Sequence, residues 1–122
     1  MSDPIRVLLA DDQQLFRAAI AIMVDAQGDM EVVGEASSGV EAVELAGQVR
    51  PDVILMDIRM PDMDGVEATR RILGREDGGV SVPKILILTT FNLDDRAATA
   101  IRHGASGFLL KDITPAQLRD AI

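Results

Sequence analysis

The chain predicts an α/β domain built on a doubly wound parallel sheet, and two observations lead to that class. Five short apolar runs rich in Val, Ile and Leu recur along the chain, and a segment with helical spacing follows each. Strands that alternate with helices pair in parallel through right-handed crossovers. Five such units in 122 residues are typical of the flavodoxin-like (βα)5 sheet with strand order 2-1-3-4-5.

The apolar runs define the strands. They mostly lack polar alternation, as expected for strands of a parallel sheet that helices cover on both faces. The predicted strands are Ile5–Ala10, Met30–Ala36, Val53–Met56, Ile85–Thr89 and Gly107–Leu110.

Capping residues mark where the helices begin. A residue that caps a helix is often followed three positions later by Glu or Gln, which bonds back to the cap. Such pairs are Ser38 with Glu41, Asp64 with Glu67, and Thr114 with Gln117. A fourth helix starts near Asn92, and Asp95 lies in its first turn, where the positive helix end favours an acid.

Helical spacing predicts which side of each helix faces the sheet. On the first helix the predicted inner residues are Leu15, Ala19, Ile22, Met23 and Ala26. On the later helices they are Val40, Val43, Ala46, Ile72, Leu73, Ala97, Ala100 and Ile101.

Composition excludes several classes of function. The net charge of −8 argues against this segment binding nucleic acid, which requires a basic surface. The absence of cysteine excludes disulfides and thiolate metal sites. The chain has neither an apolar stretch of the roughly 20 residues that span a membrane nor the layout of a secretory signal. We therefore expect a cytoplasmic protein without a membrane partner.

Polar residues gather where the predicted strands end. Asp11 and Asp12 follow the first strand, Asp57 the third and Lys111 the fifth, and Thr89 ends the fourth. In the predicted order the first and third strands are neighbours, so the acids meet at the edge where such sheets bind ligands. Oxygen ligands without His or Cys favour Mg²⁺. An aspartate can attack a phosphoryl group, with a lysine and a hydroxyl beside it to neutralise and bind that group.

Each of these residues also has a simpler interpretation. Alone, an Asp at a strand end is more often a turn former or helix cap, and a Lys is more often a solvated surface residue. The common position at four strand ends favours a joint site. Asp62 and Asp64 are interpreted as turn and cap, and His103 as an exposed residue near a helix end.

Four motifs in order resemble the receiver domain of two-component response regulators. They are the Asp11–Asp12 pair, Met56–Gly65 (MDIRMPDMDG), Leu88–Thr90 (LTT) and Gly107–Lys111 (GFLLK). The resemblance covers essentially the whole chain. The residues of Leu88–Phe91 and Gly104–Asp112 are most similar to those of the NarL/FixJ subgroup, whose members carry a LuxR-type helix-turn-helix.

The resemblance implies a role for each matching residue. Asp57 would accept a phosphoryl group from the histidine of a sensor kinase. Asp12, Asp57 and the backbone carbonyl of Arg59 would hold Mg²⁺, and Asp11 would support the metal through water. Lys111 would pair with the phosphoryl group.

A switch is implied as well. Thr89 would bond the phosphoryl group and Phe108 would turn inward as the switch aromatic. The face made by the fourth helix, fifth strand and fifth helix would then control an output, which we expect to be transcription. Dimerisation on phosphorylation is left open.

The end of the chain implies a larger protein. Ile122 lies about two turns into the last predicted helix, which family members usually continue. We expect residues 1–122 to be a receiver domain cut within that helix. A C-terminal helix-turn-helix domain would follow in the full-length protein, and DNA would be bound only through it.

Two other functions compete with a signalling switch that has no external substrate. A Mg²⁺-dependent phosphohydrolase also forms an aspartyl phosphate, but such enzymes usually place a second Asp where this chain has Arg59. A flavin carrier of the same fold needs a hydroxyl-rich phosphate loop and aromatics. This chain has Asp11-Asp12-Gln13-Gln14 at that loop and no Trp or Tyr.

Overall fold

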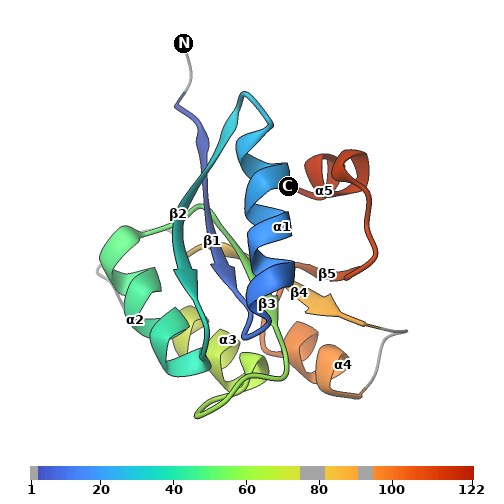
Figure 1. The fold of residues 1–122 in the computed structure, drawn as a ribbon. Coiled ribbons are helices and arrows are strands. Elements are labelled where there is room, and N and C mark those ends of the chain that lie inside the picture. The colour runs from blue at the N-terminus through green and yellow to red at the C-terminus, as the bar shows by residue number, and fades with distance from the viewer. Residues whose placement is uncertain (1–2, 75–81, 91–94) are drawn as a thin grey trace.

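The computed structural model describes residues 3–74, 82–90 and 95–122, in which strands and helices alternate (Figure 1). The strands are β1 (Ile5–Ala10), β2 (Met30–Ala36), β3 (Val53–Asp57), β4 (Lys84–Thr89) and β5 (Gly107–Leu110). The helices are α1 (Gln14–Asp25), α2 (Gly39–Val49), α3 (Gly65–Leu73), α4 (Asp95–Arg102) and α5 (Pro115–Ala121).

All five strands form one parallel sheet in the order β2-β1-β3-β4-β5, which confirms the predicted topology. The ladders align the carboxyl ends of the strands. Ala10 pairs with Met56, and Thr89 pairs with Leu110. Residues that directly follow the strands therefore lie along one edge of the sheet.

The sheet separates two apolar cores. In Figure 1, α2, α3 and α4 cover one face and α1 and α5 cover the other. Because successive side chains of a strand point to opposite faces, the buried strand residues divide alternately between the cores. The α2–α3–α4 core takes Leu8, Ile54, Met56, Ile85 and Ile87 from the strands. The α1–α5 core takes Val7, Leu9, Val53, Leu55, Leu86 and Leu88.

Three predicted helix caps are confirmed. The side chain of Ser38 accepts from the Glu41 N–H, that of Asp64 from the Glu67 N–H, and Thr114 forms a reciprocal capping box with Gln117. The predicted cap at Asn92 lies outside the described residues. Within the described segments, no helix has both the length and the apolar character needed to cross a bilayer.

The predicted inner face of α1 is wrong except at Met23, which is partly buried against the α1–α5 core. Ile20 and Val24 are the buried residues of the helix, whereas Leu15 is 88% exposed and Ile22 is 72% exposed. The error has a physical cause: apolar residues surround most of this helix, so helical spacing fits more than one face. On the later helices, Val40 and Ile101 are also more exposed than predicted.

Candidate functional site

The carboxyl edge of the sheet brings the predicted site residues together from four strands. Asp57 is the last residue of β3, and Asp11 directly follows β1, whose end pairs with β3. Thr89 ends β4, and its carbonyl accepts from the N–H of Lys111 at 2.8 Å, just beyond β5. Parallel pairing thus aligns residues that are far apart in the sequence.

Three carboxylates form the centre of the site. One oxygen each from Asp11, Asp12 and Asp57 lies within 4.8 Å of the others. Asp11 is 1% exposed and Asp57 is 7% exposed, while Asp12 faces solvent. Burial and the Asp11 carboxylate raise the pKa of Asp57 to about 6, against the opposing effects of Lys111 and the Ile58 N–H. The positive charge near Asp57 therefore does not offset the combined effect of burial and the Asp11 carboxylate.

The Lys111 ammonium is the counter-charge closest to the buried acids. Its Nζ lies 2.8 Å from Asp11 Oδ2 and 3.5 Å from Asp57 Oδ1. It also donates to the side-chain oxygen of Gln13 at 2.8 Å and lies 4.7 Å from the centre of the Phe16 ring. The contacts of Gln13 and Phe16 with Lys111 could not be predicted from the sequence, because no spacing along the chain indicates which side chain near α1 reaches a residue beyond β5.

One buried oxygen of the cluster faces the lysine and has a lone pair available for a second partner. Asp11 Oδ2 is buried, and the partner that the described residues give it is the Lys111 ammonium at 2.8 Å. A buried acceptor of this kind is costly unless a partner satisfies it. The ligand atoms that Asp11, Asp12 and Asp57 offer are all carboxylate oxygens, a set that fits a hard divalent cation such as Mg²⁺.

The loop after Asp57 is held by close backbone contacts. The Ile58 N–H donates to Asp57 Oδ1 at 2.9 Å, and the Ile58 carbonyl accepts from the Gly65 N–H at 2.7 Å. A Cβ at Gly65 would lie 2.0 Å from the Asp57 carbonyl oxygen, and one at Gly39 would lie 2.0 Å from the Met63 carbonyl oxygen. Glycine is therefore required at both places for the loop to keep this course.

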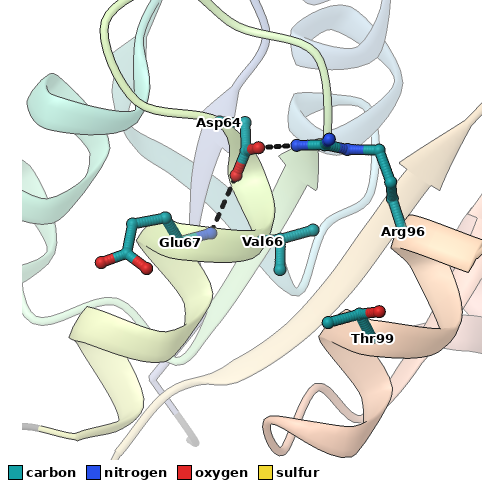
Figure 2. Close-up of a pocket in the computed structure, with 5 residues that line it drawn as sticks. All are labelled: Asp64, Val66, Glu67, Arg96 and Thr99. Carbon is teal, nitrogen blue, oxygen red and sulfur yellow. Dashed lines mark hydrogen bonds and ion pairs between the residues drawn. The ribbon is translucent and has the colours of Figure 1, made fainter.

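The far end of the loop contacts α4 through Asp64 (Figure 2). One carboxylate oxygen of Asp64 accepts from the Glu67 N–H at 2.9 Å, as predicted for the cap of α3. The other forms an ion pair with Arg96 of α4, which the sequence did not indicate. The two helices flank a shallow pocket of about 270 Å³, lined by Asp64, Val66, Glu67, Arg96 and Thr99.

The remaining predicted residues differ in exposure. Thr89 is buried at the carboxyl edge, and the Arg59 side chain points to solvent in the loop after β3. Phe108 of β5 is 39% exposed. Their roles in binding and switching stay predictions. Asp62 adopts a left-handed conformation with φ of 68°, consistent with its interpretation as a turn residue, and His103 is exposed just past α4.

Residues 7–122 match the family model of the response regulator receiver domain. The chain belongs to the receiver domain family. The transcriptional regulatory protein LiaR of Bacillus subtilis is 50% identical to this receiver domain over 118 residues, which are 97% of the chain and 54% of LiaR. The chain spans about half the length of the curated relatives it matches.

Solved structures of receiver domains superpose closely on this chain. The signal receiver domain of a response regulator named NarL from Mycobacterium tuberculosis superposes with a TM-score of 0.89 and 35% identity, covering 98% of this chain and 94% of that one. A LuxR-family two-component response regulator from Aurantimonas gives 0.85 and 34%, covering 98% and 82%. The resemblance to NarL- and LuxR-type receiver domains, inferred from the motifs, is confirmed.

Proposed function

We propose that this receiver domain is a phosphorylation switch in which Asp57 accepts a phosphoryl group from the histidine of a sensor kinase. The observation that carries the proposal is a buried carboxylate at a strand end with two further acids and a lysine ammonium beside it. The raised pKa of Asp57 supports the proposal as well, because a bound cation would stabilise the charged form of this buried carboxyl group.

The proposed step is a phosphoryl transfer. An oxygen of Asp57 bonds to phosphorus while the bond between phosphorus and the donor nitrogen breaks, which leaves an acyl phosphate on the protein. Lys111, 3.5 Å from Asp57, is placed to face the added charge. Asp11, Asp12, Asp57 and the Arg59 carbonyl are the groups that would hold Mg²⁺. The cation would supply charge neutralisation to the phosphoryl oxygens.

The output is the second part of the proposal. Thr89 would bond the phosphoryl group and Phe108, now 39% exposed, would move inward, which changes the surface formed by α4, β5 and α5. In the full-length protein a C-terminal helix-turn-helix domain would then control transcription in the cytoplasm. The named function of LiaR as a transcriptional regulatory protein supports this part.

Labelling with a small acyl phosphate and Mg²⁺ tests the proposal. Intact-protein mass spectrometry should show one added phosphoryl group, which is lost with chelator and absent in Asp57→Asn. Asp62→Asn is the matched control, because it makes the same chemical change at an exposed position of the loop that follows β3, and it should label normally.

Labelling of Asp57→Asn at the normal rate would contradict the assignment. We propose that the receiver assists only its own phosphorylation and dephosphorylation. Multiple turnover of a phosphomonoester would instead favour the phosphohydrolase, which we do not expect because Arg59 stands where such enzymes usually place a second Asp.

A further inference from the structure

Arg17 of α1 links three segments beside the acidic site. Its Nη1 donates to the backbone carbonyl of Asp11 at 2.6 Å, and its Nε donates to Glu35 of β2 at 2.9 Å. The Arg17 side chain is only 16% exposed, whereas that of Glu35 is 43% exposed. A mostly buried guanidinium thus has one contact at the end of β1 and another at the edge strand.

The carbonyl that Arg17 binds is part of the peptide between Asp11 and Asp12. The other polar groups of Asp11 have partners as well. Its N–H donates to the Ala36 carbonyl at 3.0 Å, and its Oδ1 accepts from the Gln13 N–H at 2.8 Å. The Arg17 contact therefore adds a restraint on the peptide plane from which both acidic side chains diverge.

The chemistry of arginine suits this restraint. Its planar guanidinium offers donors in a fixed fork, so it can hold the carbonyl and the Glu35 carboxylate at the same time. A lysine at this position would keep the charge but would offer a point donor without the fork. Groups that orient metal ligands from behind commonly change metal affinity when they are removed.

We propose that Arg17 is a positioning residue for the acidic site, which aims Asp11 and Asp12 at a divalent cation by fixing the peptide between them, with Glu35 as its anchor. The inference rests on the proposed function, since it assumes that these acids bind Mg²⁺. It assigns Arg17 no contact with the cation or with the phosphoryl group.

A simple effect of charge predicts the opposite outcome. Arg17→Ala removes a positive charge near the site, so electrostatics alone would strengthen the binding of a cation. Loss of positioning would weaken it. A purely structural brace between α1 and β2 would lower the free energy of unfolding and leave the affinity of the folded protein unchanged. The direction of the change in affinity thus separates the three roles.

The experiment measures Mg²⁺ affinity by calorimetric titration and, separately, stability by urea unfolding. Arg17→Ala should bind Mg²⁺ about tenfold more weakly than the wild type. Arg17→Lys should recover part of that loss, and Glu35→Gln should show a smaller one in the same direction. Arg70→Ala, which removes an exposed arginine paired with Glu67 on α3, should bind Mg²⁺ like the wild type.

Unchanged or tighter Mg²⁺ binding by folded Arg17→Ala would overturn the inference and leave the proposed function intact. If Arg17→Ala does not fold, wild-type affinity in both Arg17→Lys and Glu35→Gln would overturn it instead. Failure of the wild type to bind Mg²⁺ would reject the metal site of the proposed function, and the role of Arg17 with it.

Discussion

Asp57→Asn should make the protein more stable at neutral and alkaline pH when no divalent cation is present. Asp57 is 7% exposed, and burial together with Asp11 raises its pKa from 3.8 to about 6 in the folded state. This difference corresponds to about 3 kcal/mol of unfavourable free energy for the charged group. Asparagine removes the charge, and its side-chain oxygen can still accept from the Ile58 N–H.

The raised pKa of Asp57 determines how the stability of the wild type changes with pH. Between pH 3.8 and about 6, the folded protein binds this proton more strongly than the unfolded chain does, so wild-type stability falls as the pH rises through that range. The cost is absent below 3.8 and complete above 6. The advantage of Asp57→Asn should therefore be about 3 kcal/mol at pH 8 and about half of that at pH 5.

Urea unfolding followed by far-UV circular dichroism suits this comparison, because the chain has no Trp or Tyr for fluorescence. Both proteins are measured with chelator at the two pH values. Asp62→Asn serves as the control. It is exposed at φ of 68°, a conformation that Asn tolerates, and its stability should change by no more than about 0.5 kcal/mol. An Asp57→Asn variant no more stable than the wild type at pH 8 would refute the reasoning.

Three further predictions use the same unfolding assay. At Mg²⁺ concentrations well above its Kd, the free energy of unfolding of the wild type should rise linearly with the logarithm of the Mg²⁺ concentration, and Asp12→Asn should show a smaller rise. An equal rise in both proteins would exclude Asp12 from the site. Gly65→Ala should cost about 2–3 kcal/mol because its Cβ meets the Asp57 carbonyl, whereas Gly28→Ala, with nothing within 4 Å, should not; similar costs would count against the contact. Thr114→Ala should cost about 1 kcal/mol through loss of the capping box on α5, and no change would show that the cap contributes little.

Much of the fold could be predicted from local pattern because a parallel sheet has strong local signals. Each strand is a short apolar run, and caps such as Ser38 and Asp64 mark helix starts in the sequence itself. The meeting of Asp11 with Asp57 also follows, because the strand order makes β1 and β3 neighbours and parallel pairing aligns their ends.

The missed features depend on packing rather than on pattern. α1 has apolar residues on several sides, so only its contact with the sheet decides that Ile20 is buried and Ile22 is exposed. The contacts of Lys111 with Gln13 and of Arg17 with Glu35 join separate elements through long side chains. Their partners are set by the distance between those elements, which a single sequence does not contain.

The shared carboxylate of Asp64 has a mechanical consequence. One oxygen holds the first turn of α3 and the other holds Arg96 in the first turn of α4, so the two helices are fastened to each other at the same end. The loop that follows Asp57 leads to Asp64, and the close backbone contacts at Gly39 and Gly65 restrict the conformation of this loop. The loop that follows β3 thus ends where one side chain contacts the first turns of both α3 and α4.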